Sequence, residues 1–473
     1  MPNILDETVD KAVNQPDNIF LSGSLPILFV KTAAPIILIM MVNGFHTLID
    51  AYFLGEFVGA DALTAVTLMF PAFMLLVALS TLVSNGYSSI LARLLGAGEK
   101  DRALNAYVDA ILLALVVCAV LIAMFLAGGD TLILWVTKGS TTLAAMGYTY
   151  MAILIFLSPL AFVLGISIDT LRCEGMLATM AAITLMSALA NTLFNYILIV
   201  EFNWGVAGSA YGTILAQACA MAAVIVVRIK KQQSSGFQLS NFRIDWKNWR
   251  RFLALGAPTS LNYVGISLSA AAILFSLQLW SGSAYEATAT AYGIVTRIMT
   301  FMFLPLLGLS MAFQTIVGNN YGAHKFGRTN ACIKIVLYVA FVYCVIFQAC
   351  LYVFRSDIGF IFVDDYEIAF QLGRILPFTT MVLFIFGPLM MIGIYFQAIG
   401  DATRAAILSL TKVYVFSLPL IFILPMFLGE IGIWYAGPLA EILSLLLTSV
   451  ILYLRFQKLQ SPWGLFTKIA PSA

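Results

Sequence analysis

Twelve apolar runs, each long enough to cross a lipid bilayer, follow one another along this 473-residue chain. Backbone amides cannot stay unpaired in lipid, and a run of about 20 apolar residues satisfies them as a spanning helix. The runs are too long and too continuously apolar for barrel strands. We therefore expect an all-α polytopic membrane protein with twelve transmembrane helices. The runs cover residues 26–54, 61–91, 104–127, 142–171, 176–200, 205–229, 252–280, 286–317, 330–354, 367–397, 403–427 and 432–456.

The charge content excludes several classes of protein. Only 10% of the residues are charged and 61% are hydrophobic, whereas a soluble domain has about 25% charged residues. A soluble enzyme, a secreted disulfide scaffold and a disordered chain are excluded on this ground. The net charge of +2 gives no basic field that would hold a nucleic acid, so we expect no nucleic-acid partner.

Cysteine and histidine are scarce and show no metal-binding pattern. The six cysteines form no CxxC pair, and we interpret them as small buried apolar residues. The only histidines, His46 and His324, are too few for haem ligation or an HExxH peptidase. We expect no cofactor other than a transported coupling ion.

The basic residues predict the orientation of the chain. With the N-terminus in the cytoplasm, 20 of the 25 lysines and arginines fall on the cytoplasmic side and 3 on the other. Residues 1–25 carry four acids and one lysine, which is typical of a cytoplasmic tail and unlike a signal peptide. The C-terminal tail, 457–473, lies on the same side in this prediction.

The chain repeats itself at one offset. The segment Gly96-Ala97-Gly98 with Arg102 recurs as Gly322-Ala323-His324 with Arg328, 226 residues later, and three further landmarks recur at offsets of 223 to 227. We predict an N-lobe (26–229, six helices), a cytoplasmic connector (230–251) and a C-lobe (252–456, six helices). Six is an even number, so the repeats are parallel, an arrangement that suits alternating access around a central cavity.

Polar side chains form stripes on three otherwise apolar spans. An ionisable group within a span is costly and indicates function, and Asp50 is the clearest case. Together the stripes could enclose one carboxylate and several neutral oxygens, a set that can hold H⁺ or Na⁺; the alternatives are an interfacial position for Asp50 and ordinary interhelical hydrogen bonding for the others. The stripes comprise Asn43, His46, Thr47 and Asp50 on the first span, Asn191 and Asn195 on the fifth, and Ser209, Thr213 and Gln217 on the sixth.

Two further acids stand near basic residues. We interpret Asp169 and Arg172, three residues apart, as a neutralising pair at the membrane interface. Glu441 and Lys412 could pair either as a structural ion pair or as part of a second site for a cation or substrate.

Arginine and methionine supply weaker candidates for the cavity. Arg297 faces the cavity or closes the C-lobe. Met40 and Met69 are candidates for an adaptable cavity lining, with core packing as the alternative. The substrate-cavity set that we predict is Asn43, His46, Gln217, Met40, Met69, Glu441 and Arg297.

Several short motifs, in their order and duplication, resemble the multidrug and toxic compound extrusion (MATE) family over about residues 26–456. The motifs are Asp50 within Leu48–Gly55, Gly96-Ala97-Gly98 with Arg102, Gly293 to Arg297, Gln314 followed by Asn320-Tyr321-Gly322-Ala323 and Arg328, and Gly400-Asp401-Ala402-Thr403-Arg404.

The resemblance implies two six-helix lobes in a V, and export of drugs or toxic organic cations against H⁺ or Na⁺ entry. It implies a monomer among lipids of the bacterial cytoplasmic (inner) membrane. Asp50 matches the family's coupling acid, and Asn191 matches an asparagine of the DinF-like branch. Asn195 stands where that branch has a second aspartate, which weakens Na⁺ binding relative to H⁺. Ser209 and Thr213 border the same site, so Na⁺ would be held by Asp50, Asn191, Asn195 and Thr213.

Other functions remain as alternatives. A flippase or exporter of lipid-linked oligosaccharide or polysaccharide, from the same superfamily, would be expected to have several arginines within its spans, and this chain has few. The second-lobe acids of the NorM-like branch are absent from 252–280 and from 367–397 except at the boundary residue Glu367. A membrane-embedded transferase would require an interfacial catalytic acid pair or histidine. We therefore expect a transporter and not an enzyme.

Overall fold

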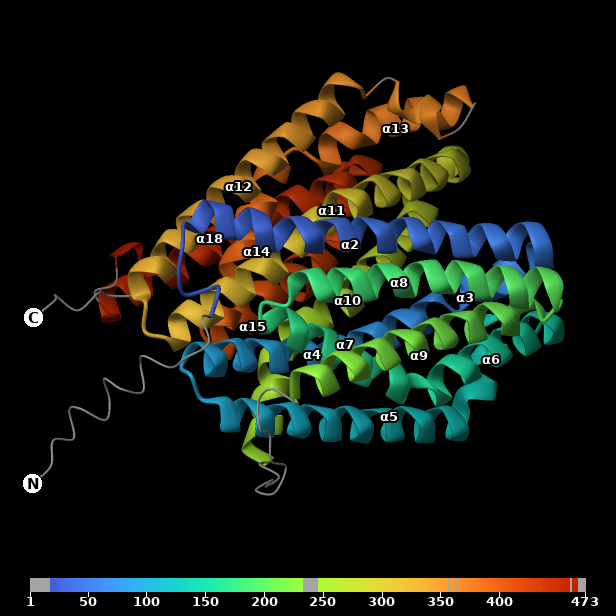
Figure 1. Ribbon diagram of the computed structural model, residues 1–473. Coiled ribbons are helices and arrows are strands. Elements are labelled where there is room, and N and C mark those ends of the chain that lie inside the picture. The colour runs from blue at the N-terminus through green and yellow to red at the C-terminus, as the bar shows by residue number, and fades with distance from the viewer. Residues whose placement is uncertain (1–17, 233–245, 356, 363–364, 460–461, 467–473) are drawn as a thin grey trace, which may run out of the picture.

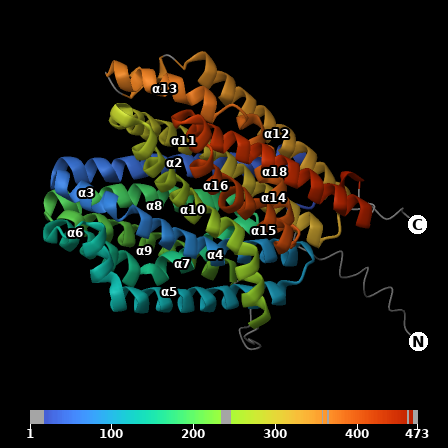
Figure 2. The same ribbon diagram turned by 180° about the vertical axis from the view of Figure 1, so that it is seen from behind.

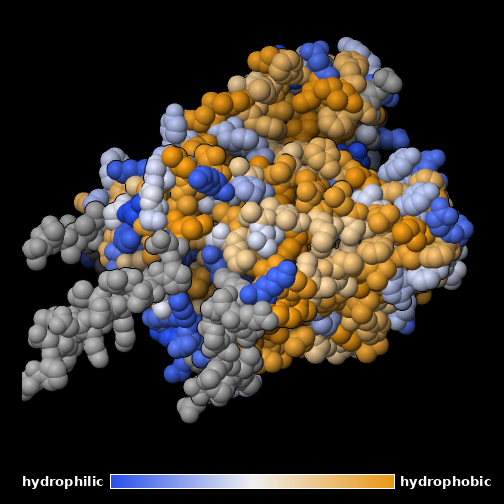
Figure 3. All heavy atoms as spheres, in the orientation of Figure 1, coloured by the Kyte–Doolittle hydropathy of each residue, from blue (hydrophilic) through white to orange (hydrophobic). Residues whose placement is uncertain are grey.

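The computed structural model describes residues 18–232, 246–355, 357–362, 365–459 and 462–466, and within them every regular element is a helix (Figure 1). The predicted all-α class is confirmed. Within the described residues, ten helices are long and apolar enough to span a membrane, and two bent pairs raise the number to as many as twelve. In the view of Figure 3, hydrophobic residues cover the middle of the molecule and hydrophilic ones gather toward its two ends, as a bilayer requires.

Residues 25–232 form the first group of helices, which we call the N-lobe. Two of its helices continue into a π-helical turn, α2 into η1 and α8 into η2. The elements are α2 (Leu25–Phe53), η1 (Leu54–Val58), α3 (Ala60–Leu68), α4 (Phe70–Gly96), α5 (Lys100–Val136), α6 (Thr141–Phe156), α7 (Ser158–Cys173), α8 (Leu177–Asn195), η2 (Tyr196–Glu201) and α9 (Gly205–Gln232).

Residues 246–466 form the second group, the C-lobe, apart from the short gaps in the described chain. Its elements are α10 (Trp246–Trp280), η3 (Gly282–Ala284), α11 (Tyr285–Gly322), α12 (Phe326–Val353), η4 (Ile358–Ile361), α13 (Tyr366–Thr379), α14 (Leu383–Ala398), α15 (Ala402–Leu410), η5 (Thr411–Ser417), α16 (Leu418–Ile423), α17 (Pro425–Leu428), α18 (Glu430–Leu459) and η6 (Pro462–Gly464).

Some expected spans are interrupted, and the interruptions recur in both lobes. The fourth span is bent by 50° between α6 and α7, and the tenth by 53° between α13 and α14. Pro159 stands at the start of α7, where its ring prevents the preceding helix from continuing. The fifth and eleventh spans each contain a π-helical segment, η2 and η5. The second span divides into α3 and α4 at Met69.

The described helices also leave shorter connecting segments than we expected. The expected connector, 230–251, is shorter here because α9 reaches Gln232 and α10 begins at Trp246; residues 233–245 lie outside the described chain. Of the expected tails, 1–25 and 457–473, residues 1–17, 460–461 and 467–473 also lie outside it.

The lobes meet at the end of the bundle where α9 ends and α10 begins, which we call the connector end. A Cβ atom on Gly96 would overlap the backbone of Asn319, and one on Gly322 would overlap the backbone of Arg93. Gly96 and Gly322 are equivalent in the 226-residue repeat, and so are Arg93 and Asn319. The same contact is therefore made once from each lobe, and α4 and α11 cross on a pseudo-two-fold axis. The lobes diverge toward the opposite, far end (Figures 1 and 2).

A short segment before α2 ties the connector end together. The side chain of Phe20 is 1% exposed. Arg328 on α12 donates to the carbonyl oxygens of Gly23 (2.8 Å) and Ser22 (3.1 Å). A Cβ on Gly175, in the turn after α7, would touch Ile19. The segment Asn18–Ser24 therefore lies between the N-lobe and the α11–α12 turn of the C-lobe.

Candidate functional site

Asp50 lies near the end of α2, half-buried, and binds two side chains of the N-lobe. Its Oδ1 accepts a 2.6 Å hydrogen bond from Nδ2 of Asn195 on α8. Its Oδ2 lies 3.4 Å from Nδ1 of His46, one helical turn earlier on the same face of α2. The carboxylate is thus held by a neighbouring helix and by its own.

Two asparagines of α8 carry the network from Asp50 to α9. Asn191 and Asn195 are one turn apart and only 3% and 0% exposed. Nδ2 of Asn195 also donates to Oδ1 of Asn191 at 2.9 Å, and Nδ2 of Asn191 donates to Oγ1 of Thr213 at 3.0 Å. The Thr213 hydroxyl donates to the carbonyl oxygen of Ser209 at 3.2 Å. All five residues that we predicted for ion coupling therefore belong to one hydrogen-bonded chain.

His46 joins this network, although its sequence position suggested only the substrate cavity. Its Nε2 lies 2.7 Å from Oδ1 of Asn191. Because the amide nitrogen of Asn191 already donates to Thr213, its oxygen faces His46, and Nε2 must carry the hydrogen. The other ring nitrogen, Nδ1, faces Asp50. The i, i+4 spacing of His46 and Asp50 was the sequence signal for this contact.

The amide of Asn195 is oriented with its hydrogens toward Asp50. Nδ2 of Asn195 bonds both Asp50 and Asn191, whereas its Oδ1 is buried without a hydrogen-bond partner and lies where a Cβ on Gly212 would sit. Na⁺ would require oxygen ligands, and those present are the Asp50 carboxylate, Oδ1 of Asn191 and Oγ1 of Thr213. The donor set thus contains one carboxylate and no second anion.

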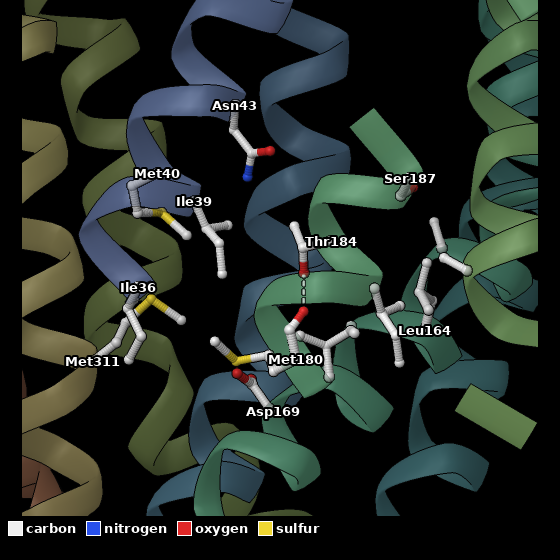
Figure 4. Close-up of a pocket in the computed structure, with 15 residues that line it drawn as sticks. Ile36, Ile39, Met40, Asn43, Leu164, Asp169, Met180, Thr184, Ser187 and Met311 are labelled. Carbon is white, nitrogen blue, oxygen red and sulfur yellow. Dashed lines mark hydrogen bonds between the residues drawn. The ribbon is translucent and has the colours of Figure 1, made fainter. Parts of the chain in front are cut away.

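A cavity of about 240 Å³ continues the polar stripes toward the connector end (Figure 4). Asn43 on α2 and Ser187 on α8 border it, each about one turn from His46 and Asn191. Its wall is otherwise mostly apolar and contains three methionines, and it has no lysine, arginine or histidine. The lining residues are Ile36, Ile39, Met40, Asn43, Ala161, Leu164, Gly165, Ile168, Asp169, Met180, Ile183, Thr184, Ser187, Ala220 and Met311.

Four other residues expected at the cavity lie elsewhere. Met69 is buried in the N-lobe core, where a Cβ on Gly147 would touch its side chain. Arg297 is exposed on α11. Gln217 is half-buried on α9, with its Oε1 unbonded. Glu441 forms an ion pair with Lys412 inside the C-lobe. Only Asn43 and Met40 of the expected cavity set line this cavity.

The side chains of the Asp169–Arg172 pair are buried within the protein, near the end of α7. Asp169 is 8% and Arg172 1% exposed, and the pair lies where the cavity, α7 and the C-lobe helix α11 meet. The sequence offered the i, i+3 spacing as a signal of pairing. It offered no signal that the pair would face a cavity and a second lobe.

The family model MatE matches residues 35–197 and again residues 259–423, one match in each lobe. The chain belongs to the MatE family. Its members are transporters, so the transporter class expected from the sequence is confirmed at this level. The DinF-like branch and the role of Asn195 stay predictions.

Individual relatives agree with this assignment. The probable multidrug resistance protein YoeA of Bacillus subtilis is 24% identical over 422 residues, covering 87% of this chain and 90% of YoeA. An FAD transporter of Shewanella oneidensis is 24% identical, covering 86% of this chain and 89% of that protein. A solved outward-facing multidrug resistance MATE family transporter of the MOP superfamily superposes with a TM-score of 0.83 at 22% identity, covering 94% of this chain and 99% of that one.

Proposed function

We propose that this MatE-family protein is a secondary active exporter of small organic compounds, many of them cationic, driven by cation antiport. The observation that carries the proposal is Asp50. It is the one carboxylate of a hydrogen-bonded network that joins α2, α8 and α9, about two turns of α2 from the cavity. Structural interhelical bonding would need only the neutral residues, and a carboxylate adds a large desolvation cost.

Coupling follows from the burial of this charge. When the lobes diverge at the far end, a cation reaches Asp50 from outside and neutralises it. The neutral group is cheaper to bury than the carboxylate, so cation binding favours the state in which the far end is closed. A ligand drives such a switch only through its different affinity for the two states, and the buried network around Asp50 supplies that difference.

We propose H⁺ as the preferred coupling ion over Na⁺. A Na⁺ ion binds best among several oxygen ligands. The network offers one carboxylate, Asp50, and Asn195 directs amide hydrogens at that carboxylate instead of an oxygen. His46 presents Nδ1 to Asp50 Oδ2 across 3.4 Å, and a single proton between the two atoms would complete a hydrogen bond.

The cavity wall favours neutral or cationic amphipathic substrates. It is mostly apolar, includes Asp169 and has no basic residue in its lining. An FAD molecule or a lipid-linked oligosaccharide carries a diphosphate, which would need basic partners in the wall. Those two substrate classes are therefore less consistent with the cavity than a lipophilic cation.

Transport in proteoliposomes with separately imposed H⁺ and Na⁺ gradients tests the proposal. We expect wild-type export of ethidium to follow the pH gradient and Asp50→Asn to abolish gradient-driven export. Glu56→Gln is the matched control, because Glu56 is an exposed acid in the neighbouring turn η1. Unchanged, gradient-dependent export by Asp50→Asn would contradict the role of Asp50, and full Na⁺-driven export at constant pH would contradict the choice of ion.

We also propose that the protein acts as a monomer in a bacterial inner membrane, surrounded by lipids and with both termini in the cytoplasm. The excess of basic residues at the connector end supports this orientation. In it, the closed connector end faces the cytoplasm and the diverging far end faces outward.

A further inference from the structure

Asp169 lines the cavity, and Arg172, which does not line it, binds the carboxylate of Asp169. Nε and Nη2 of Arg172 donate to the same carboxylate oxygen, Oδ1, at 3.2 and 2.9 Å. Asp169 is a lining residue of the cavity and Arg172 is not. Figure 4 shows Asp169 near Met180, across the cavity from Asn43. The cavity therefore has one acidic group in its wall, whose charge Arg172 neutralises.

The same guanidinium reaches the other lobe. Nη1 of Arg172 donates to the carbonyl oxygen of Met311 at 2.8 Å and to Oγ1 of Thr315 at 2.7 Å, both on α11. Arg172 belongs to α7 of the N-lobe, so its position beside Asp169 is held partly by C-lobe acceptors. These acceptors lie at the connector end, where α4 and α11 cross.

Separation of the lobes at the connector end would remove both α11 acceptors from Arg172. The guanidinium would then be bonded only through Asp169, and it would be free to turn into the water that enters between the lobes. A charged group leaves a buried position readily once water can solvate it. Asp169 would remain in the cavity wall as an unneutralised carboxylate.

We propose that Asp169 binds the cationic group of the substrate and that Arg172 is a built-in competitor which displaces it when the connector end closes. This inference rests on the proposed export of organic cations. In the connector-open state the substrate cation pairs with Asp169. On closure, α11 draws Arg172 onto Asp169, the substrate loses its ionic partner, and it leaves toward the far end.

The size of the cavity agrees with a state of low affinity. Its volume of about 240 Å³ is below the roughly 300–1,000 Å³ of ordinary small-molecule pockets. Closure at the connector end thus coincides with a small cavity and a neutralised acid, and both features oppose substrate retention. The difference in affinity between the two states is what alternating access requires.

Binding of tetraphenylphosphonium to the purified full-length protein tests the inference, with neutral triphenylphosphine oxide as the uncharged probe. We expect Asp169→Asn to weaken tetraphenylphosphonium binding about tenfold and Arg172→Gln to strengthen it about tenfold. Neither variant should change binding of the oxide to that extent. Arg228→Gln is the matched control, because Arg228 pairs with Glu174 in the same lobe and does not line the cavity.

Arg172→Lys is a second variant, which tests the inference if Arg172→Gln fails to fold. A lysine keeps the positive charge but cannot bond Asp169 and both α11 acceptors in the planar arrangement of arginine, so it should also strengthen tetraphenylphosphonium binding, by a smaller factor. Unchanged or weaker binding in the Arg172 variants, or wild-type affinity in Asp169→Asn, would overturn the inference. If Asp50 still governs efflux in that case, the proposed function survives and only the role of Asp169 and Arg172 fails.

Discussion

At the scale of the residue, the Asp50 network depends on which atom each amide presents. The oxygen of Asn191 faces His46 and its nitrogen faces Thr213, while the nitrogen of Asn195 faces Asp50. Replacing one amide by a carboxylate would turn an attractive contact with Asp50 into a repulsion between two negative charges. The proposed preference for H⁺ over Na⁺ therefore depends on which amide atoms face Asp50 and not on the helices that carry them.

Asn195→Asp should move the coupling ion toward Na⁺. The new carboxylate replaces a donor to Asp50 with a second negative charge, and two adjacent carboxylates bind a metal cation more strongly than one. We expect export in proteoliposomes to become stimulated by an inward Na⁺ gradient at constant pH. Thr192→Ala is the control, since its hydroxyl bonds only the backbone of α8. An Asn195→Asp protein with no gain in Na⁺ dependence would contradict this explanation.

At the scale of the element, the segment before α2 behaves as part of the fold. Phe20 belongs to the larger hydrophobic core, and Asn18 donates to Oδ1 of Asn319 at 2.8 Å. Composition alone suggested a polar tail, because the acids of residues 1–17 outweigh the few apolar residues that follow. The contacts of Asn18–Ser24 with α11 and α12 depend on tertiary packing that no local pattern specifies.

Arg328→Gln should loosen this segment. The substitution removes the charged donor to Gly23 and Ser22, and hydrogen bonds to charged groups contribute about 1.5–3 kcal/mol each. We expect amide hydrogen exchange within residues 18–24 to become at least about tenfold faster. The control is Lys334→Gln, an exposed cation on the same helix. Equal exchange in wild type and Arg328→Gln would show that Phe20 and the remaining hydrogen bonds, such as that of Asn18, hold the segment without Arg328.

At the scale of the whole molecule, closure of the connector end depends on backbone contact between lobes. Gly96 and Gly322 let α4 and α11 approach until their backbones touch, as small residues do between membrane helices. The polar contacts of Arg172 and the segment Asn18–Ser24 add to the same closed end. Closer to the far end, Gly44 of α2 lies against a side chain of α11, that of Leu304, and not against its backbone, so this contact opposes separation of the lobes less.

Gly322→Ala should bias the protein toward a connector-open state. The added methyl group overlaps the backbone of Arg93, which cannot move aside as a flexible side chain could. We expect spin–spin distances between labels on the two lobes at the connector end to lengthen, with loss of transport. Gly293→Ala is the matched control on the same helix, where nothing lies within 4 Å of the added atom. Unchanged distances in Gly322→Ala would exclude glycine packing as the basis of closure.

Several features of the site followed from the sequence because they depend on local spacing. The stripes on α2 and α8 repeat at one helical turn, so Asp50, His46, Asn191 and Asn195 each share a face with a neighbour. Met69 and Arg297 show where that reasoning stops. Met69 lies at the break between α3 and α4, and Arg297 lies on α11. The sequence does not say which face of a span turns to the core, the cavity or the outside, since that depends on how the neighbouring helices pack.

By itself, the sequence determined that the chain is a membrane-spanning helical protein with two repeated halves and a carboxylate in its first span. Lipid imposes the spanning helices through hydropathy and the cost of unpaired backbone, and the carboxylate stands out because lipid disfavours it. The repeated halves follow from motifs that recur at one offset. Only the tertiary structure decided that Asp50 meets Asn195 and that His46 meets Asn191. It also decided that the cavity ends at Asp169 and that Arg172 links this acid to the other lobe. Those contacts join residues up to 145 positions apart, and their geometry is set by how the helices bend and cross.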